Sequence, residues 1–143
     1  MSSWNGDEDG GNRSAGSLVS HLVAWLPVVA YMGLIFFLSG RPSMVQEVPG
    51  HEKIPYLNKY GHIVEYGVLG WLLRRALTRS RMQTRLGTTR MALLIASLYG
   101  ISDELHQYFV PTRLCEFSDM VIDTLGAAIG LWVKRTLESR VKS

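Results

Sequence analysis

The stretch LVSHLVAWLPVVAYMGLIFFL, Leu18–Leu38, decides the fold class because it contains no acidic or basic side chain apart from His21. A helix of this length crosses a hydrocarbon core of roughly 30 Å. The residues that follow, SGRPS at 39–43, supply the helix-stop residues Gly40 and Pro42 and no small-residue cleavage site. The sequence therefore predicts a membrane-spanning helix here rather than a cleaved signal peptide.

Three further apolar segments follow, and each of them also carries ionisable residues. Their lengths fit short or tilted membrane helices, and several prolines interrupt the loop after the first helix. The predicted fold class is all-α, a four-helix transmembrane bundle with helices at Leu18–Leu38, Tyr60–Leu77, Met91–Val110 and Phe117–Val133. We assign residues 1–17 to a disordered N-terminal tail, 18–137 to the membrane domain and 138–143 to a basic C-terminal tail.

The positions of the arginines predict how the bundle is oriented. The segment RRALTRSRMQTRLGTTR at 74–90 carries arginines and no acid, and the chain is again rich in basic residues from Lys134 onward. The positive-inside rule then places the middle loop and both termini in the cytoplasm. The alternative is a nucleic-acid-binding patch. Since flanking membrane helices already account for the basic residues, we expect no nucleic-acid partner.

This orientation brings the polar residues of the predicted helices to one depth, in the outer half of the membrane. The second helix starts there, the third ends there and the fourth starts there. The residues concerned are His62, Glu65, Asp103, Glu104, His106, Gln107, Asp119 and Asp123. Since the helix boundaries were not chosen to produce this convergence, we expect these side chains to form one site.

Helical spacing predicts which of these residues share a face. Residues three and four positions apart are neighbours on a helix surface. The three predicted stripes are His62, Glu65, Tyr66 and Leu69; Asp103, His106, Gln107 and Val110, with Glu104 pointing slightly aside; and Asp119, Asp123, Gly126, Ala127 and Gly130. Gly126 and Gly130 form a GxxxG motif, which allows a neighbouring helix to approach closely.

Ionisable side chains inside a membrane are costly and mark functional sites by default. Histidines and carboxylates transfer protons, so the candidate catalytic residues are His62, Glu65, Asp103, Glu104, His106 and Asp119. A guanidinium pairs with phosphate through two hydrogen bonds, so Arg113 is a candidate ligand of an anionic head group. The other candidate substrate-binding residues are the polar residues Gln107, Asp123 and Tyr66. The alternative is that the ionisable groups only pair with one another and hold the helices together.

Two short patterns raise the question of a metal. His62-x-x-Glu65 and Asp103-x-x-His106 are pairs of histidine and carboxylate three positions apart. Di-metal helical bundles project Glu-x-x-His pairs inward from facing helices, and the match here is loose because one pair runs in reverse. The chain has no Cys/His zinc spacing, P-loop or GxGxxG motif. A divalent metal therefore stays an open cofactor hypothesis.

Four segments of the chain resemble a known family. In chain order they are FFLSGRPS, NKYGHIVEYGVLGWLLRRAL, YGISDELHQYFVPTR and DMVIDTLGAAIG, and together they closely resemble the VanZ-like family of small bacterial integral membrane proteins. Many relatives have Asn where this chain has Asp123. The resemblance implies a multi-pass protein of the bacterial cytoplasmic (inner) membrane that acts at the cell envelope. The family is named after a member linked to resistance to the glycopeptide antibiotic teicoplanin, and it implies no particular reaction.

These observations lead to one main hypothesis and two alternatives, and they leave open whether the protein is an enzyme. The main hypothesis is a site that acts on an envelope lipid, such as an anionic lipid, or on a cell-wall precursor, with a link to the glycopeptide antibiotic response. The alternatives are a small proton-coupled transporter and a non-enzymatic membrane partner protein. The inner halves of the third and fourth helices carry no polar residue except Ser97, which disfavours a polar path across the membrane.

Overall fold

The structure is a computed structural model, and it describes residues 8–41, 57–80, 82, 86–111 and 117–141. These residues form the helices α1 (Glu8–Ser39), α2 (Leu57–Arg79), α3 (Thr88–Tyr108) and α4 (Phe117–Val141). No strand occurs in this part of the chain. The all-α prediction is therefore confirmed. By length and composition, only α1 among the described helices qualifies as a candidate membrane span, over Leu18–Ser39.

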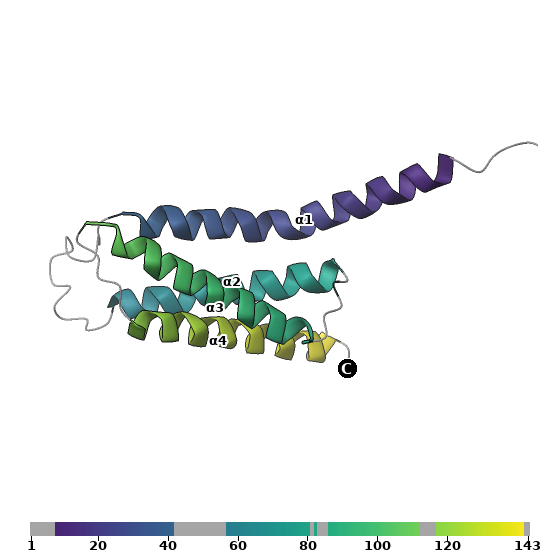
Figure 1. Cartoon of the computed structure of the whole chain (residues 1–143). Coiled ribbons are helices and arrows are strands. Elements are labelled where there is room, and N and C mark those ends of the chain that lie inside the picture. The colour runs from purple at the N-terminus through teal and green to yellow at the C-terminus, as the bar shows by residue number, and fades with distance from the viewer. Residues whose placement is uncertain (1–7, 42–56, 81, 83–85, 112–116, 142–143) are drawn as a thin grey trace, which may run out of the picture.

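The helices alternate in direction. In Figure 1, α1 and α3 run one way along the bundle, and α2 and α4 run the other way. One end of the bundle therefore contains the ends of α1 and α3 and the beginnings of α2 and α4. We call it the Ser39 end, after the last residue of α1. The start of α1 and the end of α4 both lie at the opposite end (Figure 1).

Each of the four helices extends beyond a predicted boundary, and α3 begins at Thr88 rather than Met91 but ends at Tyr108, two residues before the predicted Val110. Helix α1 begins at Glu8 and so includes part of the segment predicted as a disordered tail, whereas residues 1–7 lie outside the described residues. Helix α2 continues to Arg79, and α4 continues to Val141. Once a helix has formed, each added residue gains one backbone hydrogen bond at small cost, so charged residues at an end do not stop it.

At the end of the bundle opposite Ser39, α2 is tied to α3 and α4. Arg74 of α2 donates from Nε and Nη2 to Glu138 Oε2 of α4, at 3.1 and 2.6 Å, and from Nη1 to Thr89 Oγ1 of α3. Lys134 Nζ lies 3.7 Å from the other carboxylate oxygen of Glu138. Arg74 lies within the predicted second helix as part of the arginine-rich segment, whereas Glu138 was predicted in the C-terminal tail. Both are helical in the structure, and they join neighbouring helices.

Glycines bring α2 and α4 into backbone contact. A Cβ atom added to Gly126 would lie 2.6 Å from the carbonyl oxygen of Ile63, and one added to Gly70 would lie 2.6 Å from that of Ala127. Gly130 likewise faces the carbonyl of Gly67. The GxxxG motif of α4 therefore packs against α2, as its sequence predicts. The contact at Ile63 and Gly126 adjoins His62 of α2 and lies one turn from Asp123 of α4, so it holds these two residues close together.

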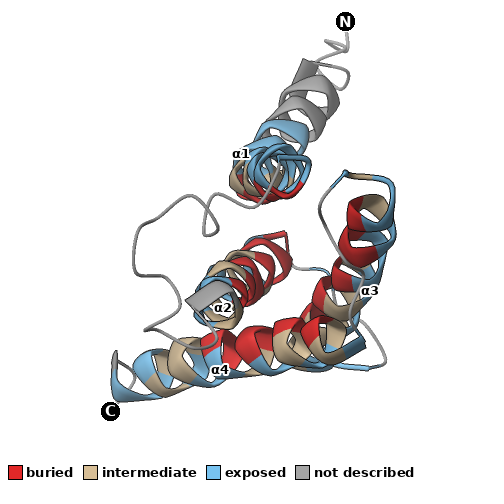
Figure 2. Cartoon of the chain, turned by 90° about the vertical axis from the view of Figure 1, so that its left-hand side faces the viewer, coloured by how far each residue is buried: buried red, intermediate tan, exposed pale blue. Residues whose placement is uncertain are grey.

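The buried positions of α2, α3 and α4 face one another along the bundle axis, as Figure 2 shows. Towards the end opposite Ser39 the core is apolar and includes Leu69 and Leu73 of α2, Ala92 and Ala96 of α3, and Leu131 of α4. Towards the Ser39 end the buried side chains are polar: Ser39, His62, Asp103, Glu104, Gln107, Asp119 and Asp123. Apart from Ser80, just after α2, the buried polar side chains of the described residues therefore lie at one end of the core.

Candidate polar site at the Ser39 end

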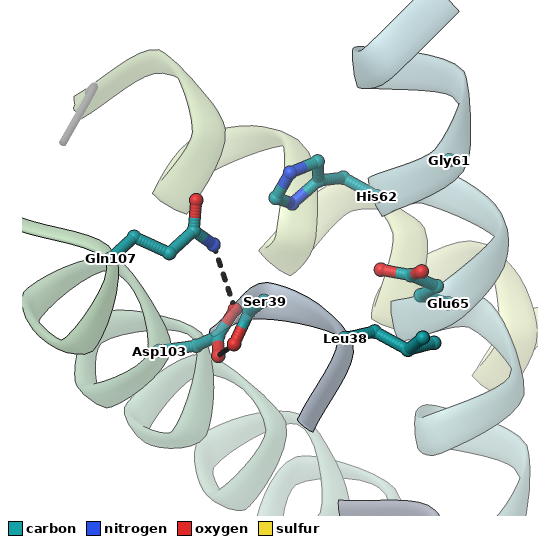
Figure 3. A pocket seen from close by; sticks show the side chains of 7 residues that line it. All are labelled: Leu38, Ser39, Gly61, His62, Glu65, Asp103 and Gln107. Carbon is teal, nitrogen blue, oxygen red and sulfur yellow. Dashed lines mark hydrogen bonds between the residues drawn. The ribbon is translucent and has the colours of Figure 1, made fainter. Parts of the chain in front are cut away.

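A small pocket opens where the end of α1 lies between α2 and α3. Its volume is about 80 Å³, and it is lined by Leu38, Ser39, Gly61, His62, Glu65, Asp103 and Gln107. Figure 3 shows Asp103 and Gln107 of α3 facing His62 and Glu65 of α2, with Ser39 of α1 beside Asp103. Four residues of the predicted site therefore line a single pocket.

The Asp103 carboxylate is fixed by two neutral donors. Ser39 Oγ donates to Asp103 Oδ1 at 2.6 Å, and Gln107 Nε2 donates to Asp103 Oδ2 at 2.9 Å. Asp103 is only 2% exposed. Hydrogen bonds to an ionised group are roughly twice as strong as bonds between neutral groups, so both donors hold the carboxylate in place. Because Ser39 is the last residue of α1, this contact also joins α1 to α3.

His62 and Asp123 form a second polar pair, between α2 and α4. His62 Nδ1 lies 2.9 Å from Asp123 Oδ1, and the two residues are 5% and 0% exposed. The ring of Tyr66 stacks parallel to that of His62 one turn further along α2, with 6.5 Å between their centroids. A carboxylate bonded to one ring nitrogen fixes the orientation of an imidazole. His62 also lines the pocket, so this fixed imidazole is available to a bound molecule.

The structure corrects the predicted face of α3. Glu104, which was expected to point aside, is fully buried. His106, which was expected on the shared face, is half-buried and stacks on Phe36 of α1, with ring centroids 4.0 Å apart. The reason is the arrangement of the neighbouring helices, because α2 and α4 flank one side of α3 and α1 flanks the other. Glu104 therefore belongs to the buried polar group, and His106 belongs to the contact between α1 and α3.

The remaining predicted residues lie apart from the pocket. Asp119 is buried in the first turn of α4, 3.6 Å from Lys59 Nζ of α2. Lys59 also donates to Ser118 Oγ at 3.0 Å. Asp119 therefore ties α4 to α2 and does not line the pocket. Arg113, the predicted head-group ligand, lies outside the described residues.

Sequence reasoning missed two of these polar contacts. Ser39 was interpreted only as part of a helix-stop pattern, and Lys59 lies one residue before the predicted second helix and was given no role, yet each pairs with a buried aspartate. Both residues fall at the depth predicted for the polar cluster. A polar residue at the end of an apolar helix, level with carboxylates on other helices, is the signal that could have found them.

Three side chains at this end could together hold a metal ion. One ligand atom each from His62, Glu104 and Asp123 lies within 4.8 Å of the other two. Only His62 belongs to either of the two pairs that the sequence suggested. The predicted pairs His62–Glu65 and Asp103–His106 do not form such a group among the described residues.

The sequence model of the VanZ/LLP1 family matches residues 24–138. The chain belongs to the VanZ/LLP1 family. The match runs from within α1 almost to the end of α4, so every candidate residue of this VanZ/LLP1 protein lies inside it. No curated protein matches the chain, and no solved structure matches it.

Proposed function

We propose that this VanZ/LLP1 protein is a multi-pass protein of the bacterial cytoplasmic membrane that binds the head group of an envelope lipid or lipid-linked cell-wall precursor. The observation that carries the proposal is the His62–Asp123 pair at the wall of a polar pocket, beside the end of the one clear candidate span.

The distribution of apolar side chains supports a bundle surrounded by lipid. Exposed apolar residues recur every three or four positions along the outer faces: Leu94, Leu98, Ile101, Leu105 and Tyr108 on α3, and Phe117, Val121, Leu125, Ile129 and Trp132 on α4. The opposite, buried faces carry the carboxylates. A soluble protein rarely exposes apolar patches this extensive. Ionisable residues in a membrane face the bundle interior, as they do here.

The helix lengths also fit a membrane. Helices α2, α3 and α4 contain 23, 21 and 25 residues. At 1.5 Å per residue, even the shortest is about 32 Å long, enough for a hydrocarbon core of about 30 Å. Their mean hydropathy is low because each of them carries several ionisable residues. A hydropathy criterion therefore selects α1 alone, although all four helices have the required length.

The size and the lining of the pocket favour a head group over a whole lipid. The pocket is small, about 80 Å³, and most of the residues that line it are polar, so it suits a few polar groups. Glu65 and Asp103 supply carboxylate oxygens, which accept hydrogen bonds from hydroxyl or amino groups. The phosphate of an anionic lipid fits better at the rim, where the exposed Arg41 stacks on Phe37, with its guanidinium carbon 4.3 Å from the ring centroid.

His62 gives the pocket a group that can accept a proton. In known hydrolases a carboxylate bonded to one imidazole nitrogen fixes the tautomer and stabilises the charged form of the ring. Asp123 is placed to do the same for His62. A hydroxyl of the head group held by Glu65 or Asp103 would lie beside this imidazole. The site therefore suits binding with proton transfer to or from a hydroxyl or an amine.

The proposal is tested by identifying the lipids that the protein retains. The full chain would be extracted from bacterial membranes with its surrounding lipid, and mass spectrometry would compare wild type, His62→Ala and Glu65→Gln with the control His21→Ala. We expect one class of hydroxylated or amino lipid to be enriched in wild type and control and lost in both pocket variants. Identical lipid profiles in all four proteins would overturn the head-group proposal.

A link to the glycopeptide response is the second part of the proposal. A protein that holds a cell-wall precursor changes how much of it is exposed to an antibiotic that acts at the envelope. Expression of the wild type should then raise the inhibitory concentration of teicoplanin, and His62→Ala should not, at equal membrane abundance. If expression of the wild type leaves the inhibitory concentration of teicoplanin unchanged, the antibiotic link is wrong, whereas the lipid-binding proposal is unaffected.

A further inference from the structure

Three helices each bring one metal-binding side chain to the same buried point. His62 comes from α2, Glu104 from α3 and Asp123 from α4, and one ligand atom of each lies within 4.8 Å of the others. The three residues are 5%, 0% and 0% exposed. Clusters of acidic groups on a protein surface are common and do not by themselves indicate a metal site. A histidine and two carboxylates that meet inside a helical bundle are a different case, because burying charged groups is costly unless they are paired or bind a metal.

We propose that His62, Glu104 and Asp123 bind a divalent transition-metal ion, Zn²⁺ or Mn²⁺. Imidazole nitrogen is a preferred ligand of zinc, and carboxylate oxygen is a ligand of both zinc and manganese. Three protein ligands leave coordination positions open for water or a substrate, as in catalytic metal sites. The proposal stands whether or not a lipid head group occupies the neighbouring pocket.

The distances fit such an ion. Two neighbouring ligands on an ion with bonds of about 2.1 Å lie roughly 3 Å apart. His62 Nδ1 and Asp123 Oδ1 are 2.9 Å apart, so these two atoms already have that separation, and in the metal-bound form the ion would replace the hydrogen bond that joins them here. Glu104, with its ligand atom within 4.8 Å of both, needs to move inward by less than about 2 Å, which side-chain rotation supplies.

A second observation points to a ligand at this place. Asp123 Oδ2 is buried and has no hydrogen-bond partner among the described residues, and the same is true of Tyr66 Oη. A buried polar atom without a partner costs about as much as a lost hydrogen bond, so native structures seldom keep one. If Asp123 bound the ion with both oxygens, Oδ2 would gain the ion as a partner. A water held by the ion could likewise hydrogen-bond to Tyr66 Oη.

The backbone around the cluster leaves room for the carboxylate. A Cβ atom on Gly100 of α3 would lie 3.1 Å from Asp123 Oδ2 and 3.3 Å from a ring carbon of Tyr66. Gly100 therefore lets the α4 aspartate approach the α3 backbone one turn before Glu104. His62 also lines the polar pocket, so the ion would lie at the pocket wall. A head-group oxygen could then reach an open coordination position.

The first experiment measures metal in the full-length protein. The chain would be purified in detergent, stripped with a chelator, equilibrated with Zn²⁺ or Mn²⁺ and analysed by mass spectrometry of the elements. We expect stoichiometric metal in wild type. His62→Ala, Glu104→Gln and Asp123→Asn should each weaken binding by more than about tenfold, since even residues that only support a metal ligand have effects of this size. The matched control is His106→Gln, a histidine of α3 two positions from Glu104, and it should bind like wild type.

The second experiment identifies the ligands and does not require the variants to fold. X-ray absorption at the zinc edge of the wild type should show one imidazole and oxygen ligands at about 2.0–2.2 Å and no sulfur. The added metal should also raise the melting temperature of wild type and His106→Gln. A sulfur ligand, wild type without bound metal, or folded ligand variants that bind metal like wild type would overturn the proposal.

Discussion

Substitution of Gly126 by alanine tests whether the close contact of α2 and α4 positions the polar site. The new Cβ atom would lie 2.6 Å from the carbonyl oxygen of Ile63, whereas ordinary contact begins at 3.4 Å. Backbone atoms cannot rotate out of the way, so the two helices must separate here by about 0.8 Å. Ile63 is the neighbour of His62 in the sequence, and Asp123 precedes Gly126 by one helical turn. The separation therefore acts directly on the His62–Asp123 pair.

The expected effect follows from these distances. If the helices move apart as rigid bodies, the His62–Asp123 separation grows from 2.9 Å to about 3.7 Å, too long for a hydrogen bond. Forcing extra volume into a packed interface costs about 1–3 kcal/mol. The control is Gly33→Ala in α1, where a Cβ atom meets nothing within 4 Å. Alanine favours a helix over glycine at both positions, so this gain cancels when the variants are compared.

The assay is equilibrium unfolding of both variants in the same detergent, together with metal and lipid retention. Gly126→Ala should be less stable than Gly33→Ala by about 1–3 kcal/mol and should retain less ligand. Equal stability and equal ligand retention in the two variants would refute the argument, because the contact would then be neither tight nor coupled to the site.

Three further predictions concern single contacts and the topology. Ser39→Ala should lower the free energy of unfolding by about 1–3 kcal/mol in a denaturant titration, because it removes a buried donor to the Asp103 carboxylate. Arg74→Ala should cost about 1–3 kcal/mol by leaving Glu138 without its two hydrogen bonds, and Arg75→Ala should cost less than about 0.5 kcal/mol; equal costs would contradict this. A reporter enzyme that works only in the cytoplasm should be active when fused to the C-terminus. Activity of a reporter that works only outside the cytoplasm, fused at the same place, would contradict the four-span topology.

The sequence alone was sufficient for the helices and for the small-residue contact between two of them. The length of the apolar run Leu18–Leu38, which lacks charged residues, predicted the first helix, and the glycines at 126 and 130 predicted the close packing of α4. Both signals are local, because helix formation and close approach depend on side-chain size and polarity within a few turns. The helix ends were less predictable. Helix α4 continues past the predicted end because propagation is cheap once a helix has formed, and Glu138 on this extension gains a partner, Arg74, on another helix.

The membership of the site was decided by the tertiary structure, and α3 shows why. Successive residues of a helix are about 100° apart, so Glu104 and His106 lie about 80° to either side of the direction that Asp103 and Gln107 share. Nothing within α3 distinguishes these two flanks. Their roles differ because α4 and α2 approach one flank and bury Glu104, while Phe36 of α1 covers the other and stacks on His106. The sequence by itself determined that polar groups gather at one end of the bundle, and the rotation of each helix against its neighbours determined which of them meet.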